Sequence, residues 1–468
     1  MTNTNNLTEG KIFSSLLRLA LPIAGAQVMN MAYNITDMFW LGRVSAEALA
    51  ATGASGLFLW LSVGLMIIGR AGAEIGVAQS RGKGDIDAAF QYSRTALYLS
   101  LTLGILYGSF IFFLRVPLIG FFEIPDAQVA GYAIDYLAVM AFTIPLLYMS
   151  GSIGGTFVAS GNSRTPFIIS SSGIVLNMIL TPVFVFGLGL GVIGAAFASL
   201  LSQSVAFIAL VTALKRSKGR PFETYRIRAP FSLSGVINDL RYGTSNRILR
   251  LTLPISVENT LFPLLTMVVT RIEVSFGAFA LSMSRVAVQI ESLSWLVGAG
   301  FGAALTAFVG QNFGAGKHDR ISKGVRYSVW VLGSWGLFVT IIMWFGGDVV
   351  LAIFLPEFLH DPEMRRIFIT LMRILAACQI LSNIEFVGTN ALRGKGKTMP
   401  PSIISISSNV LRVILAYIMS ISPLGLMGVW GAVAFTAGLR GIAVYSWYLI
   451  DREKDKRRTQ NADTENND

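Results

Sequence analysis

The chain has 468 residues, of which 53% are hydrophobic and only 13% are charged, and its mean hydropathy is +0.62. Soluble domains carry roughly a quarter charged residues, so this composition excludes an ordinary soluble protein. The formal net charge of +11 would fit nucleic-acid binding, but the basic residues are grouped in alternate loops, which is the pattern of membrane topology. Nucleic acid is therefore not an expected partner.

Twelve apolar segments are each long enough to cross the hydrocarbon core, which takes about 20 helical residues. They lie near 16–41, 50–78, 93–114, 129–153, 165–187, 191–214, 248–271, 280–309, 325–346, 367–391, 401–421 and 426–450. Backbone polar groups in lipid must be satisfied internally, which leaves helices or closed barrels. Because these runs lack the short alternation of barrel strands, the sequence predicts an all-α integral membrane protein with twelve transmembrane helices in contact with membrane lipids.

The loops between these segments differ in charge on the two sides of the membrane. One set is basic, with Arg81, Lys83, Arg164, Lys215, Arg216, Lys317, Arg320, Arg393, Lys395, Arg452 and Lys454. The other set is short or acidic, as at Glu123, Asp126 and Asp348. The positive-inside rule makes the basic side cytoplasmic, with both termini there, in the plasma membrane of a prokaryote. The polar tail 451–468 has too few apolar residues to fold and is expected to be disordered.

The two halves of the chain repeat each other. RLALPI at 18–23 matches RLTLPI at 250–255, and PFIISSSGIVLNMIL at 166–180 shares nine of fifteen positions with PSIISISSNVLRVIL at 401–415. We expect pseudo-symmetric six-helix lobes at 12–214 and 248–450, joined by a cytoplasmic linker at 215–247. Since six spans is an even number, the lobes share one orientation, as in parallel-repeat transporters with substrate between the halves.

Polar residues follow one face of the first span. Gln27, Asn30, Asn34 and Asp37 are spaced by three, four and three residues, which places them along one side of a helix. An ionisable group inside a span costs roughly 2.5–3.5 kcal/mol on insertion scales, so Asp37 is a functional candidate by default. The alternative is that Asp37, five residues before Gly42, is hydrated near the outer surface and merely structural.

Three further polar residues lie at a similar depth to Asp37. Asn177 and Thr181 are one turn apart in span five, and Ser199 is early in span six. At 1.5 Å per helical residue, this set lies about 7–15 Å from the outer ends of the spans. One site built from these side chains is therefore geometrically feasible.

The second lobe does not repeat this chemistry, since the position equivalent to Asn177 is Arg412. Arg412 lies near the middle of span eleven and needs a counter-charge, for which Glu258 and Glu385 are the candidates. A structural salt bridge is the alternative to a transport role for this group.

Neither catalysis nor a metal site is indicated. The two histidines, His318 and His360, lie in loops on opposite sides, and no nucleophile-and-base pattern is evident at membrane depth. The single cysteine, Cys378, lies inside a span and is expected to be a small buried hydrophobe. We therefore expect no enzyme, no metal and no cofactor.

The sequence resembles the multidrug and toxic compound extrusion (MATE) family over nearly all of residues 12–450. The resemblance is carried by LPI and Asp37 before FWLG in the first span, and by two pairs of loops. These loops are AQSRGKGD at 78–85 with VGQNFGAGKHD at 309–319, and SGNSRTP at 160–166 with RGKGKTMPP at 393–401.

The resemblance implies a V-shaped central cleft and export of organic, often cationic, compounds in antiport with H⁺ or Na⁺ by alternating access. It also implies that Asp37, Asn177, Thr181 and Ser199 occupy the cation-coupling cluster of the N-terminal lobe. Some relatives have a carboxylate where this chain has Thr181, which puts a two-carboxylate site in doubt and leaves the coupling ion open. The alternative within the superfamily is a flippase for lipid-linked precursors, and the default oligomeric state is a monomer.

Overall fold

The computed structural model describes residues 6–216 and 243–465, so most of the predicted linker lies outside the described residues. The described residues form helices, turns and loops without a strand. Twelve helical segments are long and apolar enough to cross a membrane. This confirms the predicted all-α class and the number of spans.

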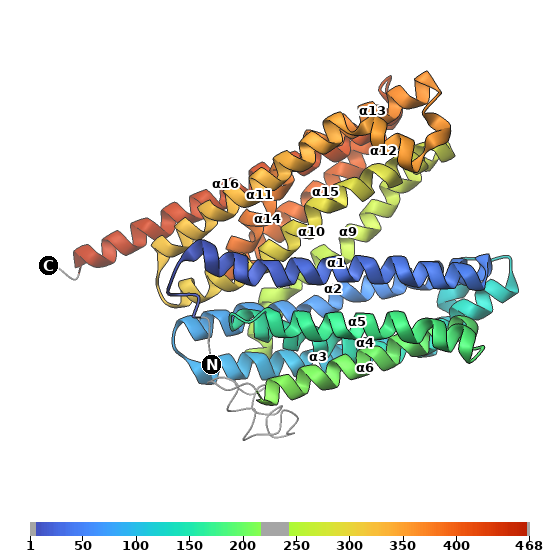
Figure 1. Cartoon of the computed structure of the whole chain (residues 1–468). Coiled ribbons are helices and arrows are strands. Elements are labelled where there is room, and N and C mark those ends of the chain that lie inside the picture. The colour runs from blue at the N-terminus through green and yellow to red at the C-terminus, as the bar shows by residue number, and fades with distance from the viewer. Residues whose placement is uncertain (1–5, 217–242, 466–468) are drawn as a thin grey trace. The chain divides into compact units, whose positions relative to one another are not determined.

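The helices of the first half run as long rods beside one another (Figure 1). They are α1 (Ile12–Val44), α2 (Ala46–Gly82), α3 (Ile86–Gly120), α4 (Ala127–Ala159), α5 (Arg164–Pro182) and α6 (Gly191–Arg216), with a π-helical segment, η1 (Val183–Gly187), after α5. The second half has α9 (Thr244–Val274), α10 (Ala278–Gly314), α11 (His318–Phe345), α12 (Gly347–Phe354), η2 (Pro356–Phe358), α13 (Pro362–Ala376), α14 (Gln379–Gly394), α15 (Met399–Ser420) and α16 (Gly425–Glu465).

Helix starts are set by short polar caps. Ser45 accepts a hydrogen bond from the backbone N–H of Ala48, and Asp85 does the same for Ala88. Such caps satisfy donors that have no partner within the helix. Asp126 and Asp361 cap α4 and α13 in the same way, so the acidic loop residues that indicated topology also define helix ends.

The chain forms two compact units. The first comprises residues 1–10, 18–260 and 310–316, and the second comprises 11–17, 261–309 and 317–468. The boundary between these units falls inside the continuous helices α1, α9 and α10, whereas the predicted lobes at 12–214 and 248–450 are joined by the linker, so the lobes stay a prediction. A helix is not interrupted where its packing partners change, so a boundary of this kind has no loop-like signal in the sequence.

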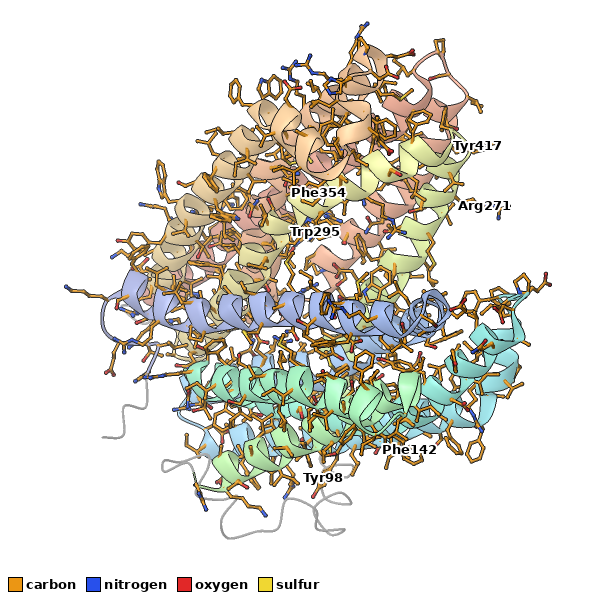
Figure 2. The ribbon with its side chains drawn as sticks, turned by 45° about the vertical axis from the view of Figure 1, so that its right-hand side comes forward. Tyr98, Phe142, Arg271, Trp295, Phe354 and Tyr417 are labelled. Atoms are coloured by element: carbon orange, nitrogen blue, oxygen red, sulfur yellow. The ribbon has the colours of Figure 1, made fainter. Side chains whose placement is uncertain are left out.

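Each unit has its own buried core. In the first, Phe58 on α2, Ile111 on α3 and Leu137 on α4 pack together. In the second, Met283, Met343 and Trp430 join α10, α11 and α16. Many large apolar side chains instead stand on the outside, as Phe142 and Tyr417 do at 58% and 59% exposure (Figure 2). An apolar exterior over a packed interior is what a lipid-facing helical bundle requires.

The tail differs from the sequence-based expectation. Residues 451–465 were expected to be disordered, but α16 continues to Glu465. Asp451 and Asp455 pair with Lys395 and Lys397, and these contacts fix the part of the tail that follows the span. Composition alone missed ion pairs with a loop more than fifty residues away.

Candidate functional site

A chain of hydrogen bonds joins the predicted polar residues of α5 and α6. The Thr181 hydroxyl donates to Asn177 Oδ1 at 3.2 Å, and Asn177 Nδ2 donates to Ser199 Oγ at 3.1 Å. Ser199 Oγ also lies 3.3 Å from the Tyr33 hydroxyl of α1. The structure therefore brings three of the four predicted site residues into direct contact, all inside the first unit.

Local backbone features of α5 bring these side chains together. A Cβ built on Gly173 would lie 2.9 Å from the Ala206 side chain, so this glycine lets α5 approach α6 closely one turn before Asn177. Directly after Thr181, Pro182 is followed by the π-helical segment, in which Leu188 N–H donates to the Val183 carbonyl. Single π turns inside helices are frequently found at functional sites.

Asp37 stands next to this chain of hydrogen bonds. Its carboxylate acts electrostatically on the hydroxyls of Tyr33 and Tyr136, which places all three groups in one neighbourhood. Asp37 Oδ1 is buried and accepts no hydrogen bond from any residue that the structure describes. A buried carboxylate oxygen without a donor is costly unless a proton or cation neutralises it, so this atom is the place in the site where either would be stabilised.

The other members of the predicted stripe on α1 have different surroundings. Gln27, Asn30 and Asn34 are exposed, whereas Asp37 is only partly so. Asn30 Nδ2 donates to the Ala26 carbonyl on its own helix. These three residues therefore do not join the buried chain of hydrogen bonds.

Sequence reasoning missed the two tyrosines. Tyr33 is four residues before Asp37, so the one-turn spacing could have identified it. Tyr136 comes from α4, and no local pattern links it to α1. Phenol groups are easily overlooked in apolar spans because aromatic residues are common there.

The second unit contains a separate network of partly buried charges. Arg440 Nε lies 2.7 Å from Glu385 Oε2. Arg412 Nε donates to the Thr436 hydroxyl at 3.1 Å. The Glu385 carboxylate also acts electrostatically on Arg412, the residue for which it is a candidate counter-charge, but its ion pair is with Arg440, which comes from α16 rather than α15. Glu258, the other candidate partner, lies on the part of α9 that belongs to the first unit.

A third polar group lies where span ten is broken between α13 and α14. Gln379, which is fully buried, accepts a hydrogen bond from Ser294 at 2.8 Å and donates to Glu291 Oε1 at 3.3 Å. Arg412 and Arg440 act electrostatically on Glu291, so the second unit balances two carboxylates with two guanidinium groups. When all four groups are ionised, the network carries no net charge.

No group of three or more histidine, cysteine, aspartate or glutamate residues could hold a metal ion within 6–216 and 243–465. The candidate site of the first unit has one carboxylate, one amide and several hydroxyls. These groups can bind a proton or a small cation, but they include no pair of a nucleophile and a base.

Comparison with known proteins identifies the family. The MatE family model matches residues 22–183 and 254–418. A probable multidrug resistance protein NorM of Thermotoga maritima is 28% identical over 90% of this chain and 88% of its own length. The probable multidrug resistance protein YpnP of Bacillus subtilis is 24% identical over 96% and 97%.

A crystal structure of a MATE protein in the bent conformation superposes with a TM-score of 0.88 at 22% identity, covering 98% of this chain and 100% of that one. The family model matches once in each half, as the internal repeat requires. The chain belongs to the MATE family of membrane transporters.

Proposed function

We propose that the chain is a secondary active transporter that exports amphiphilic organic compounds, many of them cationic, in antiport with H⁺ or Na⁺. The observation that carries this proposal is Asp37, whose buried Oδ1 has no donor and whose neighbours are hydroxyls. Membership of the family supports the substrate class, as does the similarity to two probable multidrug resistance proteins, NorM of Thermotoga maritima and YpnP of Bacillus subtilis. One chain in the prokaryotic plasma membrane, with both termini cytoplasmic, is the proposed transporting unit.

Coupling follows from the cost of the unpartnered carboxylate. A proton or Na⁺ entering from outside neutralises Asp37, which removes the penalty for burying it. α1 then repacks in the protein, with Pro22 inside the helix as the point of flexure. In the ion-bound state the substrate is released outward, and return of the ion to the cytoplasm resets the carrier.

The two coupling ions make different demands on the site. A proton needs only the Asp37 carboxylate. Na⁺ needs several oxygen ligands, which Asp37, Asn177 and Ser199 offer as carboxylate, amide and hydroxyl oxygens. Since Thr181 replaces the second carboxylate of some relatives with a hydroxyl, one carboxylate must serve for either ion.

The proposal is tested by reconstituting the full chain in liposomes and following efflux of a fluorescent organic cation under proton and sodium gradients imposed separately. At least one gradient should drive efflux by the wild type, and Asp37→Asn should abolish it. Asp135→Asn, which removes an exposed carboxylate of the same unit, is the matched control and should keep wild-type efflux.

The outcomes separate coupling from substrate class. Equal loss in both variants would reject a specific role for Asp37. If no gradient moves the dye in any protein, the multidrug assignment fails and the flippase alternative gains support. That alternative is not favoured by NorM of Thermotoga maritima and YpnP of Bacillus subtilis, which are named as probable multidrug resistance proteins.

A further inference from the structure

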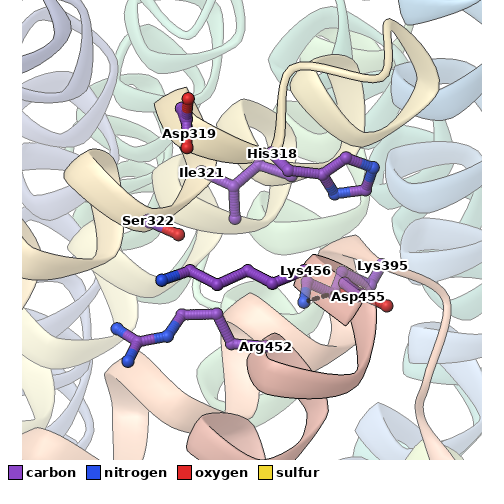
Figure 3. A pocket seen from close by; sticks show the side chains of 8 residues that line it. All are labelled: His318, Asp319, Ile321, Ser322, Lys395, Arg452, Asp455 and Lys456. Atoms are coloured by element: carbon purple, nitrogen blue, oxygen red, sulfur yellow. Dashed lines mark hydrogen bonds and ion pairs between the residues drawn. The ribbon is translucent and has the colours of Figure 1, made fainter. Parts of the chain in front are cut away.

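A pocket lies where three helices of the second unit meet at the end that carries the basic loops (Figure 3). The first turn of α11, the loop after α14 and the extension of α16 form its walls. Its lining residues are His318, Asp319, Ile321, Ser322, Lys395, Arg452, Asp455 and Lys456. None of these residues belongs to the candidate coupling site.

Part of the charge in this region is internally balanced. Lys395 Nζ lies 3.0 Å from Asp451 Oδ2 and 2.7 Å from Asp455 Oδ2, and Lys397 pairs with Asp451 as well. Two ammonium groups and two carboxylates thus form a neutral cluster. Because the Lys395 side chain is almost fully buried, this cluster acts as a rigid wall of the pocket.

The remaining charge is cationic and gathered on one side. Figure 3 shows the Ser322 hydroxyl, the Lys456 ammonium and the Arg452 guanidinium along the same side of the pocket, while the Asp319 carboxylate points away from them. Neither Arg452 nor Lys456 has an ion-pair partner among the described side chains. Two like charges held near each other favour an anion between them.

The guanidinium group also has an unmet hydrogen bond. Arg452 Nε is buried and has no acceptor among the described residues. Buried polar atoms are nearly always satisfied, so an orphan donor at the wall of a pocket calls for an acceptor. Phosphate oxygens are strong acceptors, and arginine binds them through paired, charge-assisted hydrogen bonds.

Exposed apolar side chains lie on the same helices as the pocket residues Arg452 and Ser322. Leu449, three residues before Arg452 on α16, is 36% exposed. Trp330, two turns after Ser322 on α11, is 71% exposed. Residues at these spacings share a helix face, so the cationic wall from α16 and the Ser322 wall from α11 each continue into an apolar face in the membrane-spanning part of the helix. A ligand with both a phosphate and acyl chains matches this surface.

We propose that this pocket binds the phosphate group of an anionic phospholipid from the leaflet that the proposed orientation makes cytoplasmic. Arg452 and Lys456 hold the phosphate, Ser322 donates to it, and the acyl chains lie along the faces of Leu449 and Trp330. Basic residues at the end of a span attract anionic headgroups, and the geometry here localises that attraction to one site. Bound lipid would join α11 to α16 and stabilise the second unit.

The test measures lipid retention by the full chain. Protein in micelles containing equal amounts of phosphatidylglycerol and phosphatidylcholine is examined by native mass spectrometry. Wild-type protein should retain phosphatidylglycerol preferentially, and Arg452→Gln combined with Lys456→Gln should reduce that preference several-fold. Lys454→Gln combined with Arg457→Gln removes the same charge from exposed positions of α16 outside the pocket and should keep the preference.

Other outcomes would overturn the proposal. Equal loss in both double variants means diffuse surface charge, and no loss in the pocket variant means that the lipid binds elsewhere. If inorganic phosphate at matched ionic strength displaces phosphatidylglycerol and raises the melting temperature as much, the ligand is a soluble phosphate and the lipid source is rejected. Should the pocket variant fail to fold, the exposed Lys456→Gln alone must show a partial loss of preference.

Discussion

At the scale of single residues, the polar site of the first unit contains side chains with satisfied hydrogen bonds beside a carboxylate oxygen without a hydrogen-bond donor. Thr181, Asn177 and Ser199 form a continuous chain of hydrogen bonds, which fixes the rotamers of these side chains. Asp37 Oδ1, in the same region, has no donor. Because the hydrogen-bonded side chains are held in place, binding of an ion would change mainly the charge and the surroundings of the Asp37 carboxylate. In the proposed mechanism, one titratable group would therefore suffice for coupling.

The hydrogen-bond chain predicts a specific cost for Thr181→Val. This change keeps the shape of the side chain but leaves buried Asn177 Oδ1 without its donor, which should cost about 1–3 kcal/mol of stability. Thr212→Val is the control, because the Thr212 hydroxyl bonds only to its own helix at an exposed position and its loss should change stability by less than about 0.5 kcal/mol. SDS titration in mixed micelles measures both. Equal costs would show that the chain of hydrogen bonds does not stabilise the unit.

Prediction of contacts from the sequence was correct for residues that lie at the same depth in neighbouring spans. Asn177, Thr181 and Ser199 were grouped by their distance from the span ends, and they do touch. It found only part of the answer for Glu385, whose carboxylate acts electrostatically on Arg412 but forms its ion pair with Arg440. Pairing between helices depends on how each helix is rotated about its axis, and a single sequence does not contain those rotations.

At the scale of helices, the break in span ten has a clear physical role. α13 ends at Ala376 and α14 begins at Gln379, which places Gln379 inside the unit at the discontinuity. Its amide donates to the Leu375 carbonyl, one of the acceptors freed at the end of α13, as well as to Glu291. Irregular backbone is tolerated in a membrane protein where neighbouring groups satisfy it, and Gln379 performs that function here.

Gln379 links the break in span ten to the buried Glu291, so the effects of substituting these two residues should be coupled. Gln379→Leu should cost about 1.5–3 kcal/mol, because Glu291 loses a hydrogen bond to its charged form. Glu291→Gln added to that variant should recover part of the loss, since a neutral amide is cheaper to leave without a partner. A double-mutant cycle of unfolding in mixed micelles gives the interaction energy. Strictly additive costs would show that the two side chains act independently.

Two glycines in the repeated loops allow a close crossing of α2 and α10 inside the first unit. A Cβ built on Gly82 would lie 2.0 Å from the Gln311 carbonyl oxygen, and one on Gly314 would lie 2.1 Å from the Gln79 carbonyl oxygen. The contacts are reciprocal between equivalent positions of the repeat. The Gln311 side chain adds a bond to Ala159 O at 2.7 Å and accepts one from Leu7 N–H at 3.0 Å.

Gly314→Ala should therefore destabilise the protein. The obstructing atom belongs to a backbone, which cannot rotate aside, and overpacking of this kind costs about 1–3 kcal/mol. Gly53→Ala is the matched control: its Cβ would meet nothing within 4 Å, so the change should be neutral or stabilising by up to about 1 kcal/mol. Thermal unfolding in detergent, followed by tryptophan fluorescence, ranks the two variants. A melting temperature for Gly314→Ala at or above that of Gly53→Ala would contradict the close crossing.

At the scale of the whole chain, the duplication persists in backbone conformation after the side chains have diverged. Gly84 and Gly316 have φ of 77° and 70°, and Gly161 and Gly396 have φ of 81° and 78°. Each pair occupies equivalent loops, where only glycine takes this conformation without strain. The sequence therefore predicted the number of spans and the repeat correctly. The boundaries of the two compact units have no signal in the sequence, because they lie along uninterrupted helices where only packing changes.

The charge asymmetry of the loops predicts how the chain is oriented in the membrane. In a background lacking the buried Cys378, a cysteine replacing exposed Glu357 should react with a membrane-impermeant maleimide in intact cells. A cysteine replacing exposed Lys454 should react only after the membrane is permeabilised, because the basic side is retained in the cytoplasm. The unmodified chain serves as the control, since Cys378 is 3% exposed and should stay unlabelled in both conditions. The reverse labelling pattern would invert the orientation and move the proposed lipid pocket to the outer leaflet. Labelling of both cysteines in intact cells would place positions 357 and 454 on the same side of the membrane, which would contradict the arrangement of spans between them.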